Sequence, residues 1–159
     1  MIDIHTHIIP GIDDGAEEIY DTLEMVKLAV KSGTKGIVAT PHCNIPGIYE
    51  NYFDKYYVEQ FQKAVKAVKK LGLPVNIYPG MEAFATEELP DLIVNGKIMP
   101  INQSRYVLVE FPFDADPDYA FYLLKQMKKI GAIPVVAHPE RYEFVQDNPQ
   151  VAYEWQKRG

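Results

Sequence analysis

Residues that can bind a metal ion stand at or just after the ends of the predicted strands of this 159-residue chain. The set consists of His5, His7, His42, Glu82, Glu110 and His138, and it includes every histidine of the sequence. In an α/β protein with parallel strands, the carboxyl ends of the strands gather on one face, and that face holds the active site. Histidine and carboxylate side chains are ligands for Zn, Mn or Fe. The pattern therefore predicts a multinuclear metal site.

Each position also has a simpler interpretation. His5 and His7 are two apart on a strand, so both side chains point the same way and can chelate one ion, but they could also form a polar strand face. His42, after Thr-Pro, could equally be a loop histidine. Glu82 and Glu110 are stronger candidates because each follows an apolar run, where a carboxylate is costly to bury unless it is paired or bound to metal.

The ligand mix lacks thiolates, which suits catalytic Mn, Fe or Zn better than a structural zinc. A carboxylate that bridges two ions fixes their separation, and a bridging water that loses its proton becomes a nucleophile for in-line attack on a phosphate ester. Arg141, just beyond His138, offers a planar fork that matches phosphate oxygens, although a surface salt bridge is its alternative role. Asp13 and Asp14, in the loop after the first strand, could each bind metal or cap the first helix.

Composition excludes several other classes of protein. The net charge of −6 argues against a nucleic-acid partner. Cys43 is the single cysteine, so an intramolecular disulfide is impossible, and its thiol is expected to pack in the interior. A cysteine-dependent phosphatase loop needs an arginine six residues after its cysteine, but Tyr49 stands there. We expect no signal peptide, no membrane insertion and a cytoplasmic location. Of the tyrosines at 49, 52, 56 and 57, most are expected to pack in the core or an interface, while one or two flank a substrate entrance.

The order of predicted elements favours a parallel sheet with right-handed crossovers. Asp116-Pro117 is a suitable start for the fourth helix. The predicted strands are 2–5, 36–40, 74–78, 105–111 and 133–138, and the helices are 17–32, 50–71, a short one within 86–96, 117–131 and one from 149 to the end. Either an open doubly wound sheet or part of a barrel fits one domain of this length, since eight such units take about 250 residues.

At these residues the sequence resembles the polymerase-and-histidinol-phosphatase (PHP) superfamily, and more narrowly its bacterial manganese-dependent protein-tyrosine phosphatases of capsule and exopolysaccharide clusters. The matching segments are DIHTHIIPGIDDGA, ATPH at 39–42, GME at 80–82, VLVEFPF at 107–113 and AHPER at 137–141. D-x-H-x-H alone marks the superfamily, whereas DDGA, EFPF and HPER point to the tyrosine-phosphatase branch. The resemblance implies a single PHP-like catalytic domain over 1–159, folded as a distorted (β/α) barrel of which about five strand units are present.

The resemblance also implies roles for the candidate residues. It assigns His5, His7, Glu82, Glu110 and His138 to a pair of ions bridged by Glu82, and Asp14 and His42 to a third ion. Arg141 matches the family arginine that contacts phosphate, so Arg141, His42 and Asp14 are the expected catalytic residues. The implied cofactor is Mn, as two or three ions, with Fe or Zn as alternatives. The implied substrate is a phosphotyrosine protein, typically the tail of a bacterial tyrosine kinase.

One feature departs from the family pattern. Such proteins run to about 250 residues, the size of a near-complete barrel, and carry a late Ser-Asp-Ala-His segment that completes the metal shell, followed by a second arginine. We expect a domain that is incomplete at its C-terminus, with an open edge on the fifth strand. It would be a fragment, a truncated product or a chain completed by another, and an oligomer is possible. The alternative functions are a small-molecule phosphatase of the histidinol-phosphate type and an inactive remnant that binds metal or a partner.

Overall fold

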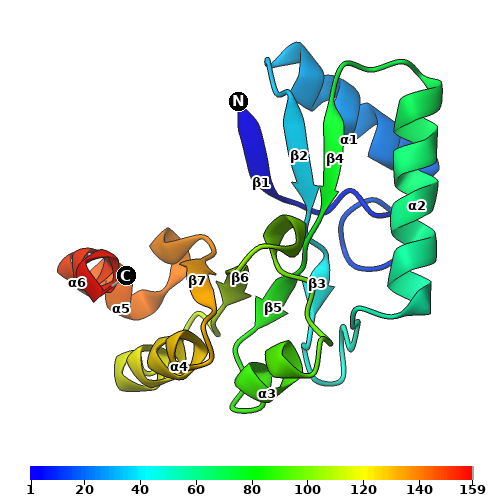
Figure 1. The fold of residues 1–159 in the computed structure, drawn as a ribbon. Helices are drawn as coiled ribbons and strands as arrows, with labels where there is room; N and C mark the ends of the chain where they lie inside the picture. The colour runs from blue at the N-terminus through cyan, green and yellow to red at the C-terminus, as the bar shows by residue number, and fades with distance from the viewer. Residues whose placement is uncertain (159) are drawn as a thin grey trace.

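Two parallel sheets form the centre of the protein in the computed structural model, which describes residues 1–158 (Figure 1). The first sheet has the order β1-β2-β4, with β1 (Ile2–Thr6), β2 (Gly36–Ala39) and β4 (Asn76–Pro79). The second has the order β3-β5-β6-β7, with β3 (His42–Cys43), β5 (Glu82–Phe84), β6 (Tyr106–Glu110) and β7 (Ile133–Val136). Every paired strand is parallel to its neighbour. The predicted parallel α/β architecture is therefore confirmed.

Two of the five predicted strands, 36–40 and 74–78, are each followed by a further short strand that belongs to the other sheet. In Figure 1, β2 leads directly into β3 and β4 into β5, so the chain crosses from one sheet to the other twice. Pro41 lies at the first break, where it supplies no backbone N–H for a ladder. Gly80 lies at the second, where a Cβ atom would stand 2.7 Å from Val38 Cγ1. The sequence analysis predicted neither β3 nor β5, and these two short strands carry His42 and Glu82.

Helices connect the strands close to where the sequence predicts them. They are α1 (Ile19–Lys31), α2 (Lys55–Lys70), α3 (Leu89–Val94) and α4 (Pro117–Lys129). The predicted cap of α4 is confirmed, since Asp116 accepts hydrogen bonds from the backbone N–H groups of Asp118 and Tyr119. The predicted start of the second helix at 50 is wrong: α2 begins at Lys55, because Asp54 accepts a bond from Tyr57 N at 3.0 Å and so caps the helix there.

Beyond β7 the chain forms three short elements at one end of the molecule (Figure 1). They are the 3₁₀ helix η2 (Pro139–Arg141), α5 (Glu143–Asp147) and α6 (Gln150–Arg158), and another 3₁₀ turn, η1 (Ile101–Gln103), precedes β6. The predicted last helix corresponds to α6, whereas η2 and α5 were not predicted. Tyr142 holds this region to the sheet: its fully buried hydroxyl donates to Ala137 O at 2.8 Å and accepts from Phe111 N at 3.2 Å.

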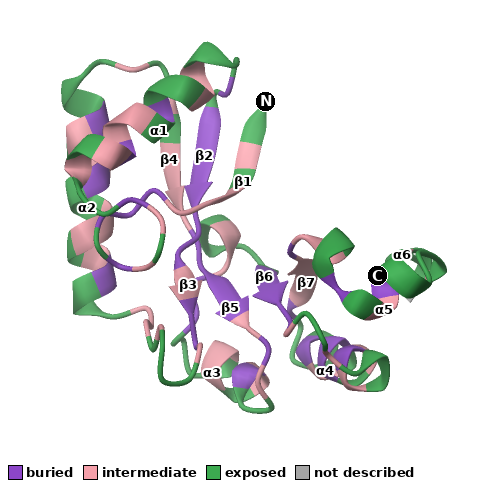
Figure 2. Cartoon of the chain, turned by 180° about the vertical axis from the view of Figure 1, so that it is seen from behind, coloured by how far each residue is buried: buried purple, intermediate pink, exposed green. Residues whose placement is uncertain are grey.

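The core follows the central strands: Figure 2 shows β2 buried along its length and most of β5 and β6 buried, while β3 is half intermediate and half buried. The outer strands are less covered, and Ile2 and Ile4 of β1 are 63% and 43% exposed. Within residues 1–158 the strands do not close into a barrel, and β1 and β7 each pair with one neighbour. None of the helices in this range combines the length and apolar composition that a bilayer span requires.

Candidate metal centre

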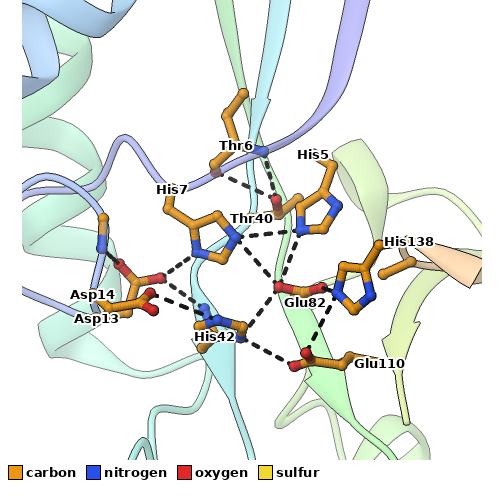
Figure 3. Close-up of polar contacts among 12 residues, drawn as sticks. His5, Thr6, His7, Asp13, Asp14, Thr40, His42, Glu82, Glu110 and His138 are labelled. Atoms are coloured by element: carbon orange, nitrogen blue, oxygen red, sulfur yellow. Dashed lines mark hydrogen bonds and ion pairs between the residues drawn. The ribbon is translucent and has the colours of Figure 1, made fainter. Parts of the chain in front are cut away.

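Glu82, on β5, is the centre of a cluster that contains all four histidines (Figure 3). Its side chain is 1% exposed. Its Oε2 atom lies 3.0 Å from His5 Nε2, 3.3 Å from His7 Nε2 and 3.1 Å from His42 Nδ1. Its Oε1 atom lies 3.1 Å from His138 Nε2. Both carboxylate oxygens therefore face histidine nitrogens, and they face different ones.

Glu110, the last residue of β6, forms the other side of the cluster. Its Oε1 lies 3.3 Å from His138 Nε2 and its Oε2 lies 3.4 Å from His42 Nδ1. The opposite ring nitrogen of His42 faces Asp14 Oδ1 at 3.6 Å, and Asp14 is 62% exposed at the solvent side. Arg141 is exposed and lines the same cavity of about 390 Å³ as these residues. The structure thus gathers every candidate residue that the sequence analysis named.

The backbone explains why these side chains meet. In the β3–β5 ladder, His42 and Glu82 are directly paired residues, which brings their side chains to the same point. His5 lies on β1, and His7 is one residue beyond its end. His138 has φ 27° and ψ 58°, in the left-handed region that a residue with a Cβ seldom adopts. Such backbone conformations concentrate at functional sites, where the surrounding structure maintains them.

Asp13 is a residue of this site that the sequence analysis left undecided. Its fully buried carboxylate accepts a hydrogen bond from His7 Nδ1 at 2.7 Å, and it also accepts from the backbone N–H groups of Gly15 at 3.0 Å and His42 at 2.8 Å. The helix-cap alternative for Asp13 and Asp14 is wrong, because Glu18 is the N-cap of α1. Metal-binding histidines characteristically donate their second N–H to a carboxylate, which fixes the ring orientation. The available sequence signal was an acidic pair six residues after His7.

Gly15 permits this arrangement because the loop passes directly over His7. A Cβ atom at Gly15 would overlap the backbone oxygen and the Cβ of His7. The N–H of Ala16 donates to His7 O at 3.0 Å, which holds the loop in place. The segment from Asp13 to Ala16 therefore holds His7 in place through contacts with both the side chain and the backbone of His7.

The electrostatics of the cluster call for added positive charge. Burial disfavours the imidazolium of His7, yet its hydrogen bonds to Asp13 and Glu82 raise its pKa to about 10. Burial likewise opposes ionisation of Glu82, but hydrogen bonds from His5 and His7 hold its pKa well below the usual range. The pKa of His42 is raised against burial by Glu110 and Glu82. The buried carboxylates thus attract protons onto the histidines, and a bound cation would replace those protons.

The distances also fit a cation. Two ligand atoms each 2.1 Å from one ion, at angles of 90° to 109°, lie about 3.0–3.4 Å apart. The contacts of Glu82 Oε2 with the three histidines span 3.0–3.3 Å. Glu82 Oε2 and His42 Nδ1 are buried and 3.1 Å apart, yet the contact between them does not have the geometry of a hydrogen bond. Three groups of residues bring one ligand atom each within 4.8 Å of one another: His5-His7-Glu82, His7-Asp14-His42 and His42-Glu82-Glu110.

Two other features lie apart from this chemistry. Cys43 is completely buried, as the sequence analysis expected, and burial raises the pKa of its thiol, so it stays protonated. A larger groove of about 940 Å³ lies between α4, β7 and α6, with Phe121, Leu124 and Trp155 among its lining residues. It includes none of the histidines or glutamates of the cluster, so its size does not make it the catalytic site.

The four histidines and two buried glutamates lie at, or within three residues of, the carboxyl ends of β1, β2, β4, β6 and β7. A parallel α/β fold that gathers such a set there is of the metal-dependent hydrolase type. The chain belongs to the capsular polysaccharide synthesis family CpsB/CapC, whose family model matches residues 1–159. The resemblance to bacterial metal-dependent tyrosine phosphatases that the sequence segments indicated is therefore confirmed.

Relatives of known name extend this assignment. The chain is 38% identical over 159 residues to the tyrosine-protein phosphatase YwqE of Bacillus subtilis (strain 168), a match that covers 100% of the chain and 62% of the relative. It is 37% identical over 155 residues to the putative tyrosine-protein phosphatase CapC of Staphylococcus aureus, covering 97% and 60%. The chain thus spans between 60% and 62% of the length of these curated relatives.

A solved structure confirms the fold. The chain superposes with a TM-score of 0.91 and 38% identity on a protein from the crystal structures of YwqE from Bacillus subtilis and CpsB from Streptococcus pneumoniae, which are described as unique metal-dependent tyrosine phosphatases. The match covers 100% of this chain and 64% of the solved one. The neighbour's description is in keeping with the candidate metal centre found here.

Proposed function

We propose that residues 1–159 form a single catalytic domain of a metal-dependent phosphatase that acts on phosphotyrosine proteins. The observation that carries this proposal is the convergence of four histidine nitrogens on the two oxygens of buried Glu82. A cluster of neutral ring nitrogens and carboxylates suits catalytic divalent ions. The names of the relatives support phosphotyrosine as the substrate.

For the metal ligands we propose a pair of ions held by five residues and a third ion held by two. The pair is assigned to His5, His7, Glu82, Glu110 and His138, and the third ion to Asp14 and His42. The division of Glu82 contacts, with three histidines at Oε2 and His138 at Oε1, supports its role as a bridge. Mn is the proposed metal because the matched sequence segments resemble manganese-dependent phosphatases, and the same nitrogen and oxygen ligands also accept Fe or Zn. When bound, such ions supply Lewis-acid activation of the phosphate ester and of the attacking water.

The chain's own residues then bind and orient the substrate. Arg141 lines the cavity from η2 and can place two N–H donors on the phosphate oxygens, as a planar guanidinium does. Asp13 keeps Nδ1 of His7 protonated, so that Nε2 presents its lone pair to the cluster. Asp14 occupies the solvent side of the cavity, and its carboxylate faces Nε2 of the more buried His42 at 3.6 Å. Buried Glu82 forms its floor and excludes bulk water there.

For the substrate we propose a phosphotyrosine tail of a bacterial tyrosine kinase that functions in capsule or exopolysaccharide synthesis. The family description, capsular polysaccharide synthesis, supports this choice, as do relatives named as tyrosine phosphatases. For this protein and its proposed substrate we propose a cytoplasmic location.

The test is phosphate release from a phosphotyrosine peptide in the presence of Mn, with and without a chelator. Two forms are compared: the 159-residue chain, and the chain joined to the C-terminal part of Bacillus subtilis YwqE that lies beyond the matched region. Bound Mn is measured separately by equilibrium dialysis. We expect release that the chelator abolishes, and loss of both release and bound Mn in Glu82→Gln.

The matched control is Glu59→Gln, which makes the same chemical change at an exposed position of α2. It is expected to keep both activity and bound Mn. If both forms of the protein bind Mn but neither releases phosphate, the proposed function is wrong. If histidinol phosphate is hydrolysed much faster than the peptide, the substrate assignment is wrong while the phosphatase chemistry stands.

A further inference from the structure

Two aromatic side chains lie against the candidate metal centre from outside the cluster. The ring of Tyr49 stacks on His42, with centroids 5.7 Å apart and planes 5° from parallel. The ring of Phe113 meets His138 edge-on, at 6.0 Å and 72°. Phe113 is 49% exposed, so its ring presents apolar surface to solvent beside a highly polar cavity. One part of this ring packs near Tyr142, with centroids 6.5 Å apart, and the exposed part is accessible to a ligand.

These rings flank the cavity because their histidines stand on different sides of the two glutamates. His42 contacts Oε2 of Glu110 and His138 contacts Oε1, and Figure 3 shows the two imidazoles separated by the Glu82 and Glu110 carboxylates. Tyr49 stacks on the first imidazole and Phe113 meets the second edge-on. An organic group attached to a phosphate at the cluster therefore has an aromatic ring near it beside each of these two imidazoles.

The backbone fixes both rings in position. Tyr49 and Ile45 exchange two backbone hydrogen bonds, each 3.0 Å long, and so close a tight loop. Asn51 anchors this loop through Nδ2, which donates to Ile12 O at 2.7 Å and to His42 O at 3.1 Å. On the other side, Phe113 O accepts from Glu143 N at 2.9 Å, which ties it to the segment that follows Arg141. Rings held in advance lose little freedom when a ligand binds.

We propose that Tyr49 and Phe113 form an aryl-binding slot, which receives the ring of a phosphotyrosine whose phosphate lies at the metal centre and Arg141. This inference rests on the proposed function and names the residues that recognise the substrate side chain. The cavity itself is lined by histidines, carboxylates, Gly15 and Arg141, so it suits the phosphate and offers the ring no apolar partner. The two flanking aromatics supply that partner at the rim.

The slot predicts a preference for aryl over alkyl phosphates. Offset or edge-on aromatic pairs with centroids 4.5–7 Å apart stabilise a complex beyond the area they bury, and the loss of one pair weakens binding by about 3- to 10-fold. An alkyl chain gains no such contact. A phosphoserine side chain, with a single carbon between oxygen and backbone, does not extend past the rim to either ring.

The experiment measures binding of phenylphosphonate and propylphosphonate, which carry the same phosphonate group and are not hydrolysed. Isothermal titration of the Mn-loaded chain gives both dissociation constants, and saturation-transfer NMR reports whether the ring protons contact the protein. We expect tighter binding of the aryl ligand, and a 3- to 10-fold loss of that affinity in Phe113→Leu and in Tyr49→Leu. Propylphosphonate binding and bound Mn are expected to stay unchanged, and Tyr49→Phe keeps the aryl preference.

Tyr20→Leu is the control, since Tyr20 is 64% exposed on α1. The slot is refuted if both ligands bind equally, if neither binds, or if the variants weaken both ligands to the same extent. A uniform loss together with lower bound Mn would mean that Tyr49 only positions His42. A normal aryl preference in a protein that releases no phosphate from a phosphotyrosine peptide would leave the slot intact and refute the proposed function instead.

Discussion

Replacing Asp13 with asparagine isolates the part of the site that holds His7. Asparagine has nearly the same shape, but it carries one acceptor oxygen and no charge. The native carboxylate accepts three hydrogen bonds, from His7 Nδ1, His42 N and Gly15 N. With its oxygen in the place of Oδ2, asparagine keeps the first two as weaker neutral bonds and turns its NH₂ group toward the N–H of Gly15. The lost bond and the lost charge together cost about 2–4 kcal/mol of folding free energy.

The same change lowers metal affinity through His7. Removing the carboxylate partner of a metal-binding histidine typically costs 10- to 100-fold in affinity, because the ring loses its fixed tautomer and orientation. Asp13→Asn is therefore expected to raise the dissociation constant for Mn by about 10- to 100-fold. Equilibrium dialysis with metal analysis measures that constant, and urea denaturation of the metal-free protein measures the folding free energy.

Asp3→Asn is the matched control for this experiment. Asp3 also accepts a hydrogen bond next to a candidate ligand, from His5 N at 3.2 Å, but it contacts only the backbone there. We expect its effect on Mn affinity to stay below about 3-fold. If Asp13→Asn binds Mn within about 2-fold of the unmodified protein, the reasoning that Asp13 orients His7 for metal binding is refuted.

Three further changes test separate contacts. The pKa of His7 is raised to about 10 in the metal-free protein. The stability that protonated His7 contributes is therefore complete below about pH 6.5 and is lost as the pH rises through about 10. The urea midpoint should fall less between about pH 6.5 and 10 in His7→Gln than in the unmodified chain. Gly15→Ala pushes a methyl group into His7 and should cost about 1–3 kcal/mol in urea denaturation and lower Mn affinity in dialysis; unchanged values would mean that the loop moves freely. Tyr142→Phe leaves the buried Ala137 O and Phe111 N without their partner and should cost about 1–3 kcal/mol, while the exposed Tyr153→Phe should cost less than about 0.5.

The sequence was sufficient for the parallel fold and for the set of residues in the cluster. Apolar runs bounded by Gly and Pro placed the five strand positions, and residues at the carboxyl ends of parallel strands must converge. That reasoning brought Glu82 and Glu110 to the same point as His138, more than 25 residues from the nearer of them, and the contacts of 3.1–3.3 Å follow from it. The prediction of the cluster succeeds because the residue at a strand end is read from the local sequence, while the parallel sheet determines which strand ends lie together.

Other features depend on contacts that no local pattern encodes. The short strands β3 and β5 lie just beyond the predicted strands 36–40 and 74–78, and the break at Gly80 depends on the close approach of Val38. The role of Asp13 depends on meeting His42, 29 residues away. Its charge and its position after a strand suited a helix cap equally well. The sequence predicted that one or two of the tyrosines at 49, 52, 56 and 57 flank a substrate entrance without saying which. The stacking of Tyr49 on His42 depends on a loop closed by backbone hydrogen bonds.

The two breaks between the sheets give the candidate metal centre a mechanical role. His5 and His7 come from the sheet of β1, whereas His42, Glu82 and Glu110 come from the sheet of β3, β5 and β6. The hydrogen-bonded ladders stop at the breaks, so ions bound by side chains from both sheets would link the two sheets to each other. Metal loading should then slow amide hydrogen exchange across both sheets together. Ions bound there would then stabilise the fold as well as take part in the proposed chemistry, so removal of the metal is expected to make both sheets more flexible.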